Sequence, residues 1–232
     1  MRLLGIEAVV FDLDGTLVNS VIDYRKMVSG VSEILKAHGV EVDPSQRRIW
    51  EIIQRSEEQL DRLSLGADEW REMNRKITEH LNAVELESVD KVTVIEGAKE
   101  TLERLKGMRL KVGIATRSCN AATWEALRRT GLDVFVDVLL ARDDVPYPKP
   151  DPRHLLKVIE ALGTSLDRAV FVGDTTTDLR TAREAGVTFI GVSLRPEGAE
   201  RLRQEGCKII LENLKHLPKL LDKSIDNSYS WK

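Results

Sequence analysis

Two carboxylates near the start of the chain stand where a buried strand should end. Asp12 and Asp14 follow the four apolar residues Ala8 to Phe11, and Gly15 and Thr16 come next. A buried carboxylate without a partner loses a large free energy of solvation, so it requires a cation, hydrogen-bond donors or an open strand end. The spacing is therefore suited to chemistry that uses paired carboxylates, beginning with the binding of a cation.

Three further groups of polar residues follow apolar runs in the same way. Thr116 comes after LKVGIA, Lys149 lies beyond VDVLL, and Asp174 and Asp178 follow AVFV. In an open parallel sheet, ligands bind at the carboxyl ends of the strands. If these runs are parallel strands, all four groups meet at one edge of one sheet.

The types of side chain at this edge indicate the ligand. Four carboxylates cannot lie together unaided, because like charges at close range force some of them to bind protons. Mg²⁺ suits a set of oxygen ligands, often one or two carboxylates completed by water and a substrate phosphate. Helices that begin near Thr177 and after Thr116 would direct free amide hydrogens to the same edge, which favours an anion. Together with Lys149, these features predict a phosphate-binding pocket.

Each group also has an ordinary structural explanation. The DLDGT segment could form a solvated turn, and Thr116 could cap a helix. Lys149 could be a solvated loop residue, and GDTTTD fits a helix cap as well as a site. Four such groups at successive strand ends of one sheet favour the functional interpretation.

The elements that must position these residues form a regular pattern after residue 93. Short apolar runs alternate with helical patterns, which is typical of βαβ units and a parallel sheet. Strands are predicted at residues 7–11, 110–115, 136–140, 169–172, 188–192 and 208–211. Helices are predicted at residues 98–106, 121–130, 152–162, 177–185, 197–205 and 213–221. We therefore expect an α/β fold, with an open parallel sheet covered by helices on both faces.

The segment between the first two predicted strands is too long for a simple connection. Asp12 and Thr116 are 104 residues apart, whereas a βαβ unit needs about 30 residues. Apolar residues recur at helical spacing within 21–35, 49–63 and 70–84, which predicts a small helical bundle. We expect an α/β core at 1–18 and 94–222, an inserted helical domain at 19–93 and a loose tail at 223–232.

The composition excludes several classes of protein. The 232 residues are 42% hydrophobic and 31% charged, with a net charge of −3, so no broad basic field is available for nucleic acid as the principal partner. From the pattern of the first residues we expect no signal peptide, and no apolar stretch reaches the roughly 20 residues that span a bilayer. Two cysteines are too few for a disulfide framework. These features predict a cytoplasmic protein that does not bind membranes, and they leave its oligomeric state open.

The four motifs together resemble the haloacid dehalogenase superfamily, in particular its phosphatases that carry a helical cap after the first strand, such as phosphoglycolate phosphatases. The matching segments are DLDGT at 12–16, IATRS around Thr116, PKPDP around Lys149 and GDTTTD at 173–178. The resemblance implies a Rossmann-like core with residues 19–93 as the cap. It also implies a phosphatase that acts on a small phosphorylated metabolite.

The resemblance further implies a role for each acidic residue. Asp12 would be the nucleophile that forms an aspartyl-phosphate, and Asp14 would act as general acid and then as general base. Mg²⁺ would be bound by the Asp12 carboxylate, the Asp14 backbone carbonyl and Asp174. Asp178 would lie behind these ligands and pair with Lys149.

The remaining motif residues would hold the phosphoryl group or support the loop. Thr116 and Lys149 would bind the phosphoryl oxygens, and Thr16 would steady the loop that carries the carboxylates. Arg117 stands where many relatives have Asn, so it is either an added donor for phosphate or substrate or a solvated residue at a helix start.

Two other functions remain open at this point. A phosphomutase has the same core and transfers the phosphoryl group to a second acceptor on the substrate in place of water. A receiver-type phosphoacceptor switch also combines Asp, Thr, Lys and Mg²⁺, but receivers carry the acceptor Asp at a later strand and have no such insertion. The four histidines, His38, His80, His154 and His216, lie outside the catalytic motifs, and we expect them at the surface or at its boundary.

Overall fold

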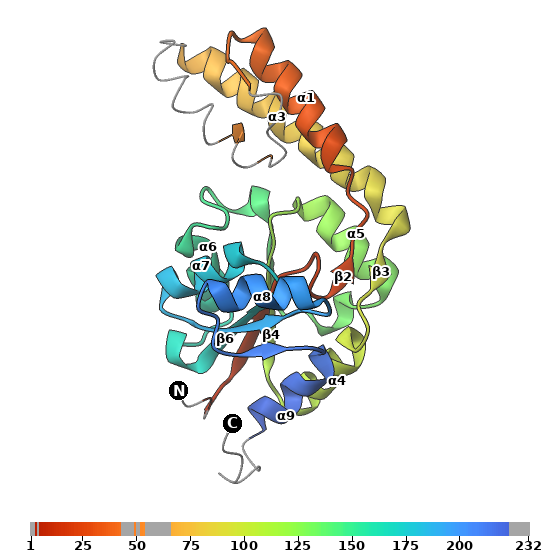
Figure 1. Ribbon diagram of the computed structural model, residues 1–232, viewed down its shortest axis with the longest axis vertical. Helices are drawn as coiled ribbons and strands as arrows, with labels where there is room; N and C mark the ends of the chain where they lie inside the picture. Colours follow the sequence, from red (N-terminus) through yellow and green to blue (C-terminus); the bar gives the residue numbers. More distant parts are fainter. Residues whose placement is uncertain (1–2, 4, 43–48, 50–51, 54–65, 223–232) are drawn as a thin grey trace. The chain divides into compact units, whose positions relative to one another are not determined.

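The computed structural model describes residues 3, 5–42, 49, 52–53 and 66–222. The chain divides into two compact units, residues 1–20 with 92–232 and residues 21–91 (Figure 1). The boundaries predicted from the sequence, 18/19 and 93/94, each differ by two residues from these observed boundaries. The predicted tail at 223–232 and most of the helix predicted within 49–63 lie outside the described residues.

The larger unit alternates strands and helices along most of its length. Its strands are β1 (Ala8–Phe11), β2 (Val18–Asn19), β3 (Thr93–Val94), β4 (Lys111–Ala115), β5 (Val138–Leu140), β6 (Ala169–Gly173), β7 (Thr188–Val192) and β8 (Ile210–Leu211). Its α-helices are α4 (Ala98–Gly107), α5 (Asn120–Thr130), α6 (Pro152–Ala161), α7 (Thr176–Ala185), α8 (Pro196–Gln204) and α9 (Leu217–Leu221). Its 3₁₀ turns are η2 (Asp133–Phe135), η3 (Arg142–Asp144), η4 (Leu166–Arg168) and η5 (Leu214–His216).

Six of these strands form one parallel sheet in the order β5-β4-β1-β6-β7-β8. β1 lies between β4 and β6, with Phe11 opposite both Ile114 and Val172. The residues that follow these three strands therefore meet at one edge of the sheet. The predicted α/β fold with a parallel sheet flanked by helices is confirmed.

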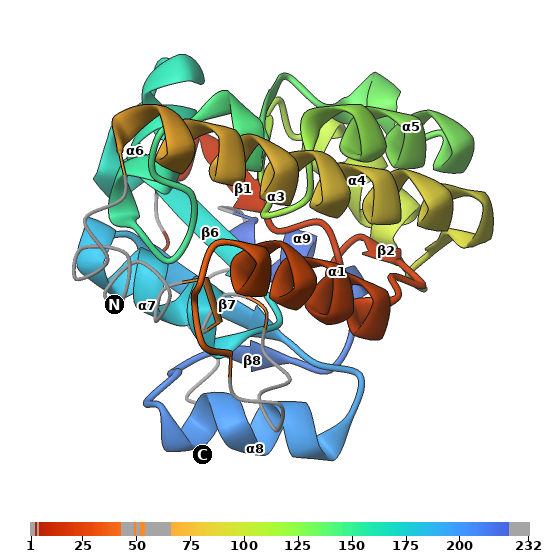
Figure 2. The same cartoon turned by 90° about the horizontal axis from the view of Figure 1, so that it is seen from above.

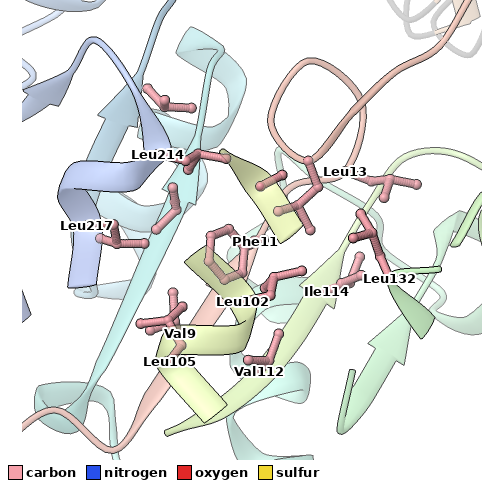
Figure 3. Packing of buried hydrophobic residues seen from close by; sticks show 14 of the residues in the cluster. Val9, Phe11, Leu13, Leu102, Leu105, Val112, Ile114, Leu132, Leu214 and Leu217 are labelled. Carbon is pink, nitrogen blue, oxygen red and sulfur yellow. The ribbon is translucent and has the colours of Figure 1, made fainter. Parts of the chain in front are cut away.

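Alternate residues of β1 contribute to two different cores, as the period of a strand requires. Val9 and Phe11 belong to the core that includes side chains of α4, α5 and α9. Figure 3 shows these two residues among the labelled leucines of that face, Leu102, Leu105, Leu214 and Leu217. Ala8 and Val10 belong to the second core, which includes side chains of α6, α7 and α8. A strand that is buried on both faces explains the continuous apolar run before Asp12.

The ends of several elements differ from the predicted ones. Strands predicted to begin at 136 and 208 begin at 138 and 210, after a turn in each case. The helix predicted at 213–221 is instead the turn η5 followed by the short helix α9. Pro218 lies at the start of α9 and lacks the amide hydrogen that one continuous helix would need there.

A short antiparallel pair of strands joins the two chain segments of the larger unit. Val18 of β2 pairs with Val94 of β3, and Asn19 pairs with Thr93. The sequence pattern does not predict this ladder, because two residues are too few to show a period. The pair brings together the residues that precede and follow the unit 21–91.

The smaller unit contains two long helices and a 3₁₀ turn among its described residues. Helices α1 (Tyr24–Ala37) and α3 (Ala67–Ser88) lie side by side, and η1 (Val89–Lys91) follows α3 (Figures 1 and 2). Their apolar faces form a separate core that includes Met27, Val31, Met73 and Leu81. In the part of the chain that the structure describes, no helix is long and apolar enough to cross a membrane.

Gly113 in β4 allows α6 to pack closely against the sheet. A Cβ at this position would lie 2.7 Å from Val158 Cγ1 and 2.9 Å from Leu162 Cδ1. We expect Gly113→Ala to lower the free energy of unfolding by about 1–3 kcal/mol, because both branched side chains would have to move. Urea denaturation followed by circular dichroism measures the change.

Gly107→Ala is the matched control, because an added Cβ there meets no atom within 4 Å. Gly107 ends α4, so alanine should leave stability unchanged or raise it by up to about 1 kcal/mol. Equal stability of the two variants would contradict the close packing of α6 on β4.

Candidate active site

Asp12 begins a tight loop at the carboxyl end of β1. Its amide donates to the carbonyl of Val172 at 2.9 Å, which continues the pairing with β6 for one more residue. The amides of Thr16, Leu17 and Val18 then all donate to the carbonyl of Leu13. The loop is therefore folded back on itself, and Asp12 as a whole residue is only 7% exposed.

Gly15 and Thr16 hold this loop against Asp174 at the end of β6. Gly15 has a φ of +87°, and a Cβ there would lie 2.4 Å from Asp174 Oδ2, so only glycine fits without displacing the carboxylate. The buried Thr16 hydroxyl donates to Asp174 Oδ1 at 3.2 Å. The loop that carries the first two carboxylates thus orients the third.

Lys149 is the cation at the centre of the site. Its Nζ donates to Asp12 Oδ1 and to Asp178 Oδ1, both at 2.7 Å, and lies 5.2 Å from the centroid of the Phe171 ring. The residue is 3% exposed. Burial opposes its charged form, but the two carboxylates outweigh burial and raise the pKa of Lys149. Lys149 is therefore a charged partner of the carboxylates rather than a solvated loop residue.

Asp178 combines a capping role with the ion pair. Its Oδ2 accepts from the amide of Thr175 at 3.2 Å, while its own amide donates to Thr175 Oγ1 at 3.3 Å, so the two residues form a capping box for α7. Its other oxygen accepts from Lys149. The helix cap that GDTTTD allows is thus present, and the same carboxylate also pairs with Lys149.

The three carboxylates of this cluster have the chemistry of a cation site. One oxygen each from Asp12, Asp174 and Asp178 lies within 4.8 Å of the others. Burial, with neighbouring carboxylates, raises the pKa of Asp12 to about 8 and that of Asp174 to about 7, although Lys149 acts in the opposite direction on both. An excess of buried negative charge that Lys149 does not neutralise fits a divalent cation with oxygen ligands.

Asp14 is partly buried and points to two serine hydroxyls. Ser118 Oγ donates to Asp14 Oδ2 at 2.6 Å, and Ser20 Oγ donates to the other carboxylate oxygen. A hydroxyl group can donate to an ionised carboxylate and accept from a protonated one. The two serines can therefore hold Asp14 in either protonation state.

Thr116 and Arg117 follow β4 at the same edge. Thr116 is fully buried, and its Oγ1 accepts from the amide of Ser118 at 3.1 Å, which leaves its hydroxyl hydrogen to donate elsewhere. Arg117 is held through its backbone, because its carbonyl accepts from Nη1 of the buried Arg142 at 2.7 Å. Ser118 thus connects Thr116 with Asp14.

His154 corrects one expectation. The residue is fully buried in the first turn of α6, whereas the sequence predicts it at the surface or its boundary. Its Nδ1 accepts from the amide of Lys149 at 3.2 Å, and its Nε2 donates to the carbonyl of Leu140 at 2.9 Å. Of the other histidines, His38 and His80 are partly buried and His216 is exposed, as predicted.

The structure brings most of the predicted site residues into direct contact. Asp12, Asp178 and Lys149 form ion pairs, and Thr16 binds Asp174. Asp14 and Thr116 are joined through Ser118, which no sequence motif marks as a site residue. The sequence gives no signal for four other residues that contact the site, because they are common residue types outside any spaced motif. These residues are Ser20, Ser118, Arg142 and His154.

Known relatives match nearly the whole chain. The pyrophosphatase PpaX of Halalkalibacterium halodurans is 28% identical over 230 residues, which cover 94% of this chain and 97% of the relative. The phosphoglycolate phosphatase of Pseudomonas putida is 25% identical over 213 residues, which cover 90% of this chain and 77% of the relative.

A solved structure supports the same fold. The crystal structure of a predicted phosphoglycolate phosphatase from Haemophilus somnus matches with a TM-score of 0.64 and 20% identity, and the match covers 95% of this chain and 100% of that one. At this identity the likeness concerns the fold alone. Residues 9–192 match the family described as haloacid dehalogenase-like hydrolase, and this range contains every site residue described above.

The match confirms the predicted superfamily and the prediction of a hydrolase, and it favours an enzyme over a phosphoacceptor switch. The chain belongs to the haloacid dehalogenase-like hydrolases.

Proposed function

We propose that this hydrolase is a Mg²⁺-dependent phosphatase that acts on a small phosphorylated metabolite through an aspartyl-phosphate on Asp12. The observation that carries the proposal is the ion pair between Asp12 and Lys149 at the edge of the sheet, with Asp174 beside it. This arrangement joins a nucleophile, a cation and a metal-binding carboxylate. The relatives named pyrophosphatase and phosphoglycolate phosphatase support a small phosphorylated substrate.

Asp12 attacks phosphorus in the first step. Its carboxylate oxygen forms a bond to phosphorus while the bond to the leaving oxygen breaks, which splits hydrolysis into two easier steps. Lys149 donates to Asp12 Oδ1, which orients the carboxylate and favours its ionised form. The short loop after β1 restricts the remaining freedom of the nucleophile.

Asp14 moves the proton in both steps. Its carboxyl group gives a proton to the leaving alcohol, and its carboxylate then accepts a proton from the water that hydrolyses the aspartyl-phosphate. The hydroxyls of Ser20 and Ser118 hold Asp14 throughout, because each can donate or accept as the protonation state changes.

Thr116, Arg117 and Lys149 bind the phosphoryl oxygens. Thr116 Oγ1 uses a lone pair to accept from the amide of Ser118, and its hydroxyl hydrogen can donate to a phosphoryl oxygen. Lys149 supplies positive charge, and Arg117 supplies further donors from the loop between β4 and α5. Charge spreads over these oxygens in the loose transition state of phosphoryl transfer, so fixed donors lower its free energy.

The carboxylates of Asp12 and Asp174 and the backbone carbonyl of Asp14 would hold Mg²⁺, with Asp178 behind them on Lys149. The ion would neutralise negative charge on the phosphoryl oxygens. The clustering of oxygens and the raised pKa values of Asp12 and Asp174 support this assignment.

The inserted residues 19–93 form the cap of this enzyme in our proposal, and residues 1–18 and 94–222 form its catalytic core. The separate apolar core of the smaller unit supports an independent domain. Substrate selectivity then belongs to residues of the cap, because the core residues bind only the phosphoryl group.

We expect Asp12→Asn to reduce the release of inorganic phosphate from p-nitrophenyl phosphate about 10³-fold or more, because the amide is not a nucleophile. Asp167→Asn makes the same change at an exposed residue before β6, at the opposite edge of the sheet, and should leave activity unchanged. Turnover by a correctly folded Asp12→Asn variant at the parent rate would refute the assignment of Asp12 as the nucleophile. With a sugar phosphate as the substrate, formation of an isomerised sugar phosphate without released phosphate would instead identify a phosphomutase.

Binding of Mg²⁺ should strengthen as the pH rises from 6 to 9. The raised pKa values of Asp12 and Asp174 mean that both carboxyl groups carry protons at pH 6, and the cation has to displace them. We expect the dissociation constant to fall about tenfold or more over this range, as measured by isothermal titration calorimetry. EDTA should abolish turnover. A dissociation constant that does not change with pH would contradict the carboxylate ligands.

The effect of Ser118→Ala on kcat/KM should depend on the leaving group of the substrate. An alkyl phosphate such as glycerol phosphate needs a proton on its leaving oxygen, so we expect its kcat/KM to fall about tenfold or more. p-Nitrophenyl phosphate has a good leaving group and should change less than about threefold. Ser165→Ala, at an exposed serine before β6, is the control. Equal losses for both substrates would exclude a role of Ser118 in holding the acid.

A further inference from the structure

The loop that carries Lys149 has few backbone hydrogen bonds available to it. Prolines alternate with other residues through the segment VPYPKPDP, at Pro146, Pro148, Pro150 and Pro152. A proline lacks the amide hydrogen, so half of the positions in this segment cannot donate. The amide of Lys149 is one of the remaining donors, and it binds a side chain, His154 Nδ1, rather than a backbone carbonyl.

The two partners of His154 require one form of its ring. The amide of Lys149 can only donate, so Nδ1 must be without a proton, and the carbonyl of Leu140 can only accept, so Nε2 must carry one. Burial lowers the pKa of His154 to about 4, which keeps the ring neutral at neutral pH. The imidazole therefore connects the end of β5 to the backbone of Lys149.

A fixed backbone matters for Lys149 because its side chain is long and makes two short contacts. Nζ has to lie 2.7 Å from both Asp12 and Asp178, and the whole residue is buried. A misplacement of about 1 Å in a group that contacts the reacting atoms can cost about 100-fold in rate. The contact with His154 restrains the point from which the side chain extends.

We propose that His154 is a positioning residue for the reaction: its neutral imidazole fixes the Lys149 backbone to the end of β5 and so holds Nζ against Asp12 and the phosphoryl oxygens. This inference rests on the proposed phosphatase function. It assigns to a buried histidine outside the four motifs a role that acts only through Lys149.

Three substitutions separate the two hydrogen bonds of the ring. His154→Phe keeps a planar ring and removes both bonds. His154→Asn keeps an oxygen near the position of Nδ1 that can accept from the amide of Lys149. His154→Gln reaches toward Leu140 with its amide donor and leaves no acceptor near Lys149. The Asn and Gln variants each retain one hydrogen bond, so they form a matched pair.

The measurement is steady-state hydrolysis of p-nitrophenyl phosphate with Mg²⁺, together with the inhibition constant of orthovanadate and the melting temperature. For His154→Phe we expect kcat to fall about 10- to 100-fold and the inhibition constant to rise at least about tenfold. His154→Asn should recover kcat to within about threefold of the parent protein, whereas His154→Gln should remain near the Phe variant. His216→Phe, at an exposed histidine, should keep the parent constants.

A merely structural role predicts a different pattern. The Asn and Gln variants would then share similar melting temperatures and similar kinetic constants, and that result would overturn the proposal. A folded His154→Phe variant with parent kinetics would overturn it as well. If His154→Phe does not fold, the kinetic constants of the His154→Asn and His154→Gln variants still distinguish a positioning role from a structural one. Activity in Asp12→Asn would instead refute the proposed function, whereas an inactive Asp12→Asn beside a fully active His154→Phe would refute only the inference.

Discussion

The arrangement of this protein depends on buried charge at one edge of the sheet. Asp12, Asp174 and Asp178 lie together with Lys149, largely out of water. Burying ions costs several kcal/mol each unless close partners compensate. Lys149 compensates Asp12 and Asp178 directly, and the hydroxyl of Thr16 binds the third carboxylate, Asp174. The negative charge that remains raises the pKa values of Asp12 and Asp174 and makes the site suited to a divalent cation.

The parallel sheet makes this concentration of charge possible. Adjacent parallel strands lie about 4.8 Å apart, so residues that follow neighbouring strands are in reach of one another. β1 is flanked by β4 and β6, and the three strands are followed directly by Asp12, Thr116 and Asp174. The close approach of the loops at this edge also requires that no side chain lies between them. A Cβ at Gly15 would collide with Asp174, and one at Gly173 would lie 2.7 Å from the Cβ of Asp178.

Several residues around the site contribute both to the fold and to the proposed reaction. Asp178 caps α7 with one oxygen and binds Lys149 with the other. Ser118 donates its amide to Thr116 and its hydroxyl to Asp14. His154 links β5 to the loop of Lys149. The contacts of Asp178 with Lys149 and of Ser118 with Asp14 join elements that are far apart in the sequence, so the packing of the core positions these charged groups.

The sequence by itself determined the class of fold, the six strands of the sheet and the motif residues that meet at its edge. These features follow from local patterns, because a buried strand needs an apolar run and a carboxylate after such a run needs a partner. Only the tertiary structure decided that His154 is buried, that Ser118 binds Asp14 and that residues 214–221 form a turn and a short helix. Asp14 and Ser118 are 104 residues apart, and no local period encodes such a contact. Hydrogen-bond partners across that distance depend on how the helices and strands pack, which a residue's neighbours in the chain do not specify.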